Sequence, residues 1–190
     1  AVALLGFETS ELVTELLIYF SDDLTLPRME ATALYAGILV DTKNFAVQTG
    51  VRTFDAAAYL RRCGADPVSV RQMFRSDFET EQAKAQAKAQ ARMMPGGLII
   101  TMCRESLPNI QVIAAQVADS MLRIEDVRVS MVVFQLTQDV IGISARSTGT
   151  INVQVIMEQF GGGGHQNVAG AQIFNSDIDT VLEDVITADL

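Results

Sequence analysis

Cysteine, basic residues and long apolar runs are scarce in this sequence, and each shortage excludes a class of protein. The chain has two cysteines, Cys63 and Cys103, far apart and in apolar surroundings. Their spacing fits no metal motif, so we expect buried thiols in a reducing compartment. No apolar run could cross a bilayer and no signal peptide is visible, which predicts a cytoplasmic chain without membrane contact.

Positive charge is also scarce. Lysine and arginine number 14 against 23 acidic residues, giving a net charge of −9 and a pI near 4.5. Such a chain lacks the broad basic surface that extended DNA or RNA requires. Aromatic residues are 6% of the sequence, and a basic, aromatic-lined channel for single strands is absent. A small anionic ligand in a locally positive pocket stays compatible with this composition.

The hydrophobic content, 49%, is enough for a folded core, and 190 residues make one large domain or two small ones. The first residue is alanine, which suggests a piece excised from a longer chain. Transmembrane helices upstream would place such a parent at the cytoplasmic face of the membrane.

The first part of the chain, residues 1–76, is predicted to be mainly helical. Leu12, Val13, Leu16, Leu17 and Phe20 fall on one helical face. The predicted helices cover residues 10–20, from near 27 to 38, from a cap at 53 or 55 to a glycine at 64, and 68–74, the last one capped by Asp66 and begun by Pro67.

A change in composition marks the expected domain boundary. Residues 80–92 are rich in alanine, lysine and glutamine and poor in large apolar side chains, which predicts a solvated connecting helix. Pro95, Gly96 and Gly97 end it. We therefore expect a linker over 77–95 and a second domain over 96–190.

The second domain is predicted to be α+β, with helices on one face of a mixed sheet. The predicted strands are 98–103, 127–136, 140–146 and 168–174; the predicted helices are 110–122, 150–160 and one from a cap at Ser176 to residue 186.

The run Gly161-Gly162-Gly163-Gly164-His165 stands at the centre of this domain and contains the only histidine of the chain. Four glycines cost conformational entropy but allow a ligand to approach the backbone closely. One glycine would be enough to end a helix, so the run favours a ligand-binding loop over a flexible surface loop. It matches neither a P-loop nor a dinucleotide fingerprint.

Ser144-Ala145-Arg146-Ser147 is the second informative segment. Alternation along a strand places Ser144 and Arg146 on one face. A guanidinium beside a hydroxyl suits a phosphate or a purine edge, because its planar fork binds oxyanions with two hydrogen bonds. Alone, the segment would be an exposed strand end; beside the glycine run, it favours ligand binding.

Asp41 follows the apolar residues Ile38, Leu39 and Val40. Its carboxylate could cap the next turn or bind a hard metal ion. The residues alone favour capping.

Two sets of segments resemble a known family. Residues 30–45 and 49–57 resemble the later part of a DHH phosphoesterase domain. Residues 144–147, 151–157 and 161–165 resemble its DHH-associated substrate-binding domain. The chain is most similar to the cyclic-di-AMP phosphodiesterase (GdpP-like) branch, and the resemblance implies an α/β fold.

The family resemblance implies a two-manganese centre that activates water to hydrolyse a cyclic dinucleotide to linear pApA. It implies that Asp41 is the last metal-ligand aspartate and a catalytic residue. It also implies that the remaining site residues bind substrate: Ser144, Arg146 and Ser147 on a nucleotide-contacting strand, and Gly162, Gly163, Gly164 and His165 in a clamp for phosphate and base.

The family's earlier metal motifs, a His-x-x-x-Asp-x-Asp run, a further aspartate and Asp-His-His, are absent. We therefore expect this chain to be inactive alone while it keeps a nucleotide-binding surface. The alternatives are a phosphoesterase for oligoribonucleotides or 3′-phosphoadenosine phosphate, and a non-catalytic nucleotide sensor. The apolar helices of the first part would suit a homodimer.

Overall fold

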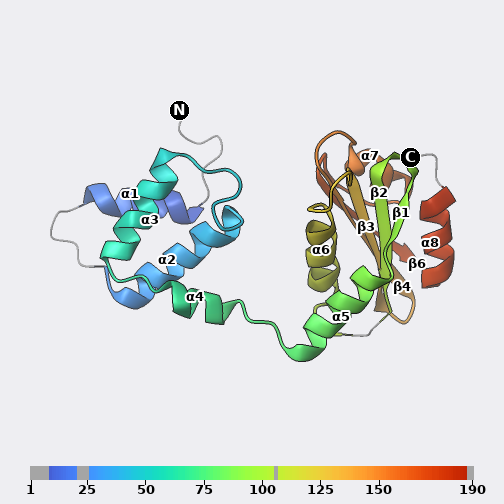
Figure 1. The fold of residues 1–190 in the computed structure, drawn as a ribbon, viewed down its shortest axis with the longest axis horizontal. Coiled ribbons are helices and arrows are strands. Elements are labelled where there is room, and N and C mark those ends of the chain that lie inside the picture. The colour runs from blue at the N-terminus through green and yellow to red at the C-terminus, as the bar shows by residue number, and fades with distance from the viewer. Residues whose placement is uncertain (1–8, 21–25, 105–106, 188–190) are drawn as a thin grey trace. The chain divides into compact units, whose positions relative to one another are not determined.

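The computed structural model describes residues 9–20, 26–104 and 107–187, and the chain divides into two compact units at Arg75 and Ser76. The first unit is helical, as predicted (Figure 1). Its helices are α1 (Thr9–Phe20), α2 (Arg28–Asp41), α3 (Val51–Arg62) and α4 (Pro67–Met73). Helix α2 packs against the other three, around a core that contains Ala31, Ile38 and Leu60.

Two of the predicted helix boundaries are confirmed. The side chain of Asp66 accepts a hydrogen bond from the backbone N–H of Val68 at 3.0 Å, with Pro67 at the first helical position of α4. Gly64 follows α3 with a φ of 93°, the left-handed conformation expected of a glycine that ends a helix.

Helix α1 differs from a simple amphipathic helix. Glu11 and Thr14 are buried, whereas Leu16 and Phe20, from its predicted apolar face, are 71% and 80% exposed. The apolar stripe of α1 is therefore only partly covered by α2 and α3.

The second unit is a six-stranded mixed sheet with helices. It comprises α5 (Phe78–Ala89), β1 (Arg92–Met94), a 3₁₀ turn (Pro95–Gly97), β2 (Leu98–Cys103), α6 (Ile110–Met121), β3 (Val129–Thr137), β4 (Val140–Ser147), α7 (Val153–Gln159), β5 (Gly163–His165), β6 (Val168–Phe174) and α8 (Ile178–Thr187). The strand order is β1-β2-β3-β4-β6-β5, and β2 and β3 are the parallel pair. The α/β class and the mixed sheet are confirmed.

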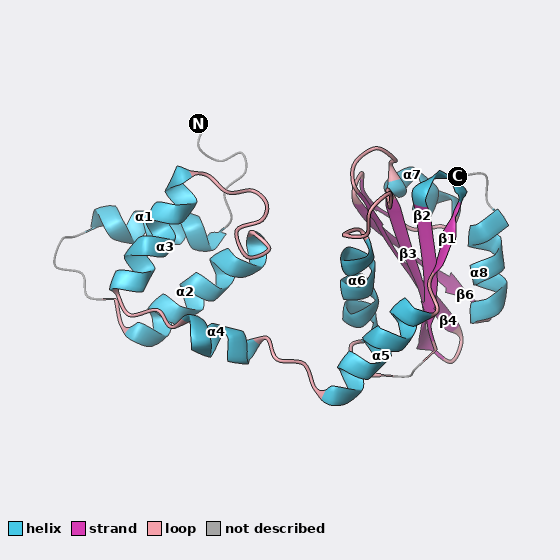
Figure 2. Cartoon of the chain, in the orientation of Figure 1, coloured by secondary structure: helices cyan, strands magenta, loops and turns pink. Residues whose placement is uncertain are grey.

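Helices cover both faces of this sheet, so the prediction of helices on one face was wrong (Figure 2). On one face, Val132 and Phe134 of β3 pack with α6; on the other, Met131 and Val133 pack with α7 and α8. Central strands with nearly continuous apolar runs bury both faces, and each face needs a covering layer.

Helix α5 is part of the second unit rather than a solvated connection, which corrects the expected linker over 77–95. Ala83 and Ala87 are buried against α6 and β2, and the hydroxyl of Thr101 donates to the carbonyl oxygen of Ala87. Alanines four residues apart lie on one helical face and allow close packing. Because each buries little area, the apolar signal in the sequence is weak.

The cap of α8 also differs from the prediction. Asp177, not Ser176, accepts hydrogen bonds from the backbone N–H groups of Asp179 and Thr180, both at 3.0 Å. Among the described residues, no helix is long and apolar enough to cross a membrane.

Candidate functional site

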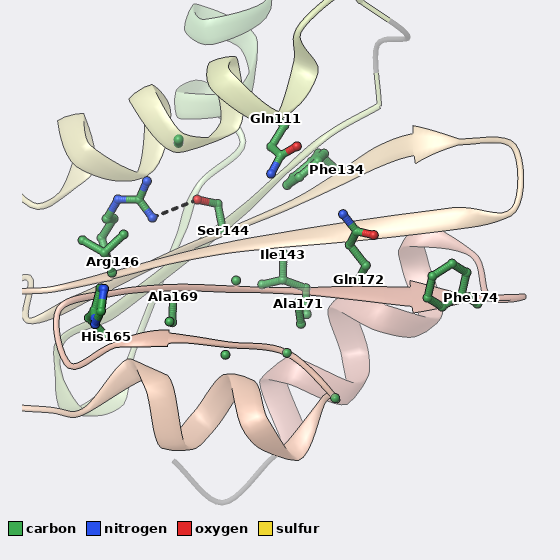
Figure 3. A pocket seen from close by; sticks show the side chains of 17 residues that line it. Gln111, Phe134, Ile143, Ser144, Arg146, His165, Ala169, Ala171, Gln172 and Phe174 are labelled. Carbon is green, nitrogen blue, oxygen red and sulfur yellow. Dashed lines mark hydrogen bonds between the residues drawn. The ribbon is translucent and has the colours of Figure 1, made fainter.

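A cavity of about 700 Å³ lies in the second unit, beside β4, β6 and β5 on the face that carries α6 (Figure 3). It is in the size range of sites for small molecules. Most of the predicted binding residues line it. They are Ser144, Arg146, Gly162, Gly163, Gly164 and His165.

The strand register explains why this part of the sheet is open. Ser144 of β4 lies opposite Gly170 of β6, and Gly170 lies opposite Gly163 of β5. A Cβ at Gly163 would have nothing within 4 Å. A row of small residues therefore forms the floor of the cavity.

Phe134 lines another part of the cavity, and its ring packs over Gly142. An added Cβ there would lie 2.2 Å from the ring of Phe134. The ring of Phe134 therefore covers Gly142 and forms a wall of the cavity, which also explains why residue 142 has no side chain.

The glycine run is not a single loop. Gly161 has a φ of 72°, and the backbone N–H of Gly162 donates to the carbonyl oxygen of Met157 at 2.8 Å, so the first two glycines end α7. Residues 163–165 then form β5. The helix-ending and ligand-facing interpretations each describe part of the run.

Two of the glycines are required by the approach of one backbone to another. A Cβ at Gly162 would lie 2.2 Å from the carbonyl oxygen of Gly170, and one at Gly164 would lie 2.4 Å from that of Val168. These residues let β5 pack against β6, whereas Gly163 faces the cavity.

Arg146 is held in place by three contacts. Its Nη1 donates to the Ser144 hydroxyl at 3.1 Å and to the carbonyl oxygen of Ala145 at 2.9 Å, and its Nε lies 3.5 Å from a carboxylate oxygen of Asp119 on α6. A guanidinium has five N–H donors, more than these contacts use. Arg146 can therefore bind an oxyanion while its orientation is maintained.

His165 and Arg146 lie at the same end of the cavity (Figure 3). Arg146 is opposite Val168, and Val168 is opposite His165. Neighbouring strands are spaced by about 4.8 Å, so the two backbones are roughly 10 Å apart. Arg146 and His165 thus flank Val168 at this end of the cavity, and both side chains can hydrogen-bond an oxyanion.

Ser147 and Asp41 are placed elsewhere. Ser147 does not line the cavity; it is buried, and its hydroxyl accepts a hydrogen bond from the backbone N–H of Gly149 at 3.0 Å. Asp41 is the last residue of α2, in the first unit. Across the residues that the structure describes, no group of three or more His, Cys, Asp or Glu side chains could hold a metal ion.

Sequence reasoning missed Asp119, Gln111, Gln172 and Phe174. Gln172 and Phe174 alternate with Gly170 along β6 and so share its face, a pattern that was visible in the sequence. Asp119 and Gln111 lie on α6, and only the packing of α6 on the sheet brings them to Arg146 and the cavity.

The fold and the cavity of the second unit agree with a known domain family. Residues 104–188 match the family model of the DHHA1 domain, and they contain both Arg146 and the glycine run. The second unit therefore contains the region that matches the DHHA1 domain, and the resemblance to the DHH-associated family is confirmed over these residues.

The similarity to particular proteins extends over both units. The chain is 45% identical over 180 residues to the cyclic-di-AMP phosphodiesterase PdeA of Listeria monocytogenes, and 47% identical over 165 residues to GdpP of Geobacillus thermodenitrificans. These matches cover 95% and 87% of this chain, but 27% and 25% of those proteins. The chain thus spans about a quarter of the length of these relatives.

A solved structure gives the same fold. The exopolyphosphatase-related protein of Bacteroides fragilis aligns with a TM-score of 0.79 at 20% identity, over 94% of this chain and 56% of that one. At this identity the likeness concerns the fold alone.

Proposed function

We propose that this chain is the substrate-binding part of a cyclic-di-AMP phosphodiesterase, whose parent protein hydrolyses the cyclic dinucleotide to linear pApA. The names of the relatives that are 41–47% identical support this activity. The observation that carries the binding role is the position of Arg146 and His165 at one end of a single cavity.

The cavity residues can perform three tasks in binding. The guanidinium of Arg146 neutralises a non-bridging phosphate oxygen and donates hydrogen bonds to it. Asp119 and Ser144 keep the guanidinium in its orientation. His165 provides a further donor, and Gly163 leaves the space into which the phosphate fits.

Manganese is the metal that we propose for the parent protein. A carboxylate such as that of Asp41 is a suitable manganese ligand. However, the described residues do not fit a complete centre, because no cluster of three ligands forms among them. We therefore expect this chain to bind nucleotide without hydrolysing it.

The binding role is tested by calorimetric titration of the chain with cyclic-di-AMP and with linear pApA. Arg146→Ala and His165→Ala should each weaken binding by about tenfold or more, because each removes a charged or hydrogen-bonding contact to phosphate. Arg123→Ala, at an exposed arginine outside the cavity, is the matched control and should bind as the wild type does. Unchanged affinity in both cavity variants would refute the binding role.

A second candidate comes from a more distant relative. The chain is 31% identical to the bifunctional oligoribonuclease and PAP phosphatase NrnA of Mycoplasma genitalium, over 85% of this chain and 52% of that protein. Titration with 3′-phosphoadenosine 5′-phosphate distinguishes the two, since tighter binding than that of linear pApA would favour this candidate.

Three further expectations stay predictions. They are a cytoplasmic location, a homodimer, and a sensor role in a parent without the missing metal motifs. Sedimentation velocity of the chain tests the second of these directly.

A further inference from the structure

Asp119 places a negative charge beside the strongly basic group of the cavity. Arg146 is the only lysine or arginine among the described residues that line the cavity. Its Nε lies 3.5 Å from a carboxylate oxygen of Asp119, and the two side chains are 12% and 36% exposed, respectively. Because both groups are partly buried, solvent and salt screen their interaction only in part. The carboxylate therefore offsets much of the positive charge that Arg146 brings to the cavity.

The position of Asp119 on α6 explains how it reaches this end of the cavity. Gln111 and Ala115 of α6 line the cavity, and Asp119 is four residues beyond Ala115. Residues four apart lie on the same face of a helix, so the three residues follow the side of α6 that borders the cavity. This row ends with Asp119 beside Arg146.

Interactions within α6 do not account for an aspartate at this position. The helix ends at Met121, so Asp119 lies in its last turn, which contains no basic residue. A carboxylate there is disfavoured by the negative end of the helix dipole, and aspartate has a low helix propensity. The contact with Arg146, which comes from outside the helix, does account for it.

The contacts of Arg146 also limit how it can hold a phosphate. Its Nη1 donates to Ser144 and Ala145, and its Nε faces Asp119. Among the described contacts, Nη2 is the nitrogen that is left for a ligand. Since Nη2 and Nε are bonded to the same carbon, a phosphate on Nη2 also lies near the carboxylate of Asp119.

Phosphodiesters and phosphomonoesters differ in charge, and a nearby carboxylate responds to this difference. A diester carries one negative charge, whereas a monoester carries nearly two above its second pKa of about 6. Coulomb repulsion is proportional to charge, so the carboxylate opposes a monoester about twice as strongly as a diester.

We propose that Asp119 is a specificity-determining residue that makes the Arg146 end of the cavity favour phosphodiesters over phosphomonoesters. This proposal rests on the proposed nucleotide-binding function and deepens it. Hydrolysis of one diester of a cyclic dinucleotide consumes water and gives a terminal phosphomonoester and a free hydroxyl. The product therefore carries one more negative charge than the substrate, and Asp119 weakens the binding of that product.

The test uses two probes that differ by one methyl group and one charge: AMP, and the methyl ester of AMP, whose phosphate is a diester. NMR titration of the 190-residue chain at about pH 8 gives both dissociation constants. Asp119→Asn keeps an oxygen beside Arg146 but removes the charge. It should raise the affinity for the methyl ester about threefold and that for AMP about tenfold, because doubling the charge squares the factor.

Two further variants are the controls. Asp184→Asn removes the same charge at an exposed position of α8, which packs on the other face of the sheet, and it should leave both dissociation constants as in the wild type. Arg146→Ala should weaken the binding of both probes, because both bind through this guanidinium. Melting temperatures show whether each variant is folded.

The outcomes separate this proposal from the proposed function. If Asp119→Asn changes both affinities by the same factor, or lowers both, Asp119 only orients Arg146 and its role in specificity is refuted. Binding of the two probes to the wild type would still support the nucleotide-binding function. If the wild type binds neither probe and does not bind cyclic-di-AMP, the nucleotide-binding function fails, and the role of Asp119 fails with it.

Discussion

Gly162 and Gly163 are neighbours, but glycine is required for different reasons at the two positions. Substituting alanine at each position distinguishes a packing requirement from a ligand-binding one. A Cβ at Gly162 meets the backbone of β6, which cannot move without disturbing the sheet. Gly162→Ala should therefore lower the free energy of unfolding by about 2 kcal/mol. Gly163→Ala points into open space and should change it by less than about 0.5 kcal/mol. Chemical denaturation measures both values.

Gly163→Ala should instead affect ligand binding, although it leaves the stability nearly unchanged. The methyl group of Gly163→Ala enters the floor of the cavity, so this stable variant should bind linear pApA more weakly than the wild type. A Gly163→Ala chain that unfolds as readily as Gly162→Ala would show that the whole run has one structural role.

At the scale of single residues, local periodicity predicted part of the site. Alternation along β4 placed Ser144 and Arg146 on one face, and the structure confirms this. The same rule puts Ser147 on the other face, where Gly149 engages its hydroxyl. Asp119 could not be predicted, since its contact with Arg146 depends on the packing of a helix on the sheet.

At the scale of elements, two helix caps make stability depend on pH. Asp77 begins α5 and Asp177 begins α8. The pKa of Asp77 is lowered from its ordinary value of 3.8 by hydrogen bonds from the backbone N–H and then the hydroxyl of Thr80. The pKa of Asp177 is lowered by the hydroxyl and then the backbone N–H of Thr180. Each side chain therefore caps its helix better when it is an ionised carboxylate than when it is protonated.

The sign of the pH effect follows from these lowered pKa values. The folded state favours the ionised carboxyl, so the caps stabilise the unit fully above about pH 4. Their contribution is lost as the pH falls from there through the lower folded-state pKa values. The melting temperature of the chain should therefore decline in this range.

A double variant, Asp77→Asn with Asp177→Asn, tests this cause. Asparagine is also a good N-cap but does not titrate, so the decline in melting temperature below about pH 4 should be shallower. Asp184→Asn, at an exposed carboxyl of α8, is the control. A double variant with the same pH profile as the wild type would mean that other groups cause the acid sensitivity.

Strong local signals predicted most elements, and weak ones failed where tertiary packing decides. The pair Asp66-Pro67 marked the start of α4 correctly, because capping is a local interaction. At α8 two neighbouring residues, Ser176 and Asp177, could both cap, and the geometry selected the second. The burial of α5 was missed because alanine gives little apolar contrast.

At the scale of the whole molecule, the faces of the sheet were the main error. The apolar runs of β2 and β3 were recognised as strands, but continuous rather than alternating apolar residues also mean burial on both sides. The same two-sided burial explains why the second unit needs α5 as well as α6 on one face. This places the start of the unit near Ser76 rather than near residue 96.

The position of that boundary is testable with two shortened polypeptides. Residues 76–190 keep α5 and β1, and they should unfold cooperatively and bind linear pApA as the 190-residue chain does. Residues 96–190 lose β1, which pairs with β2, and the alanines of α5 that pack against the core. We expect this shorter polypeptide to be less stable by roughly 3 kcal/mol, comparable to a large deletion in a core. Equal stability of the two polypeptides in urea would show that α5 is a linker after all.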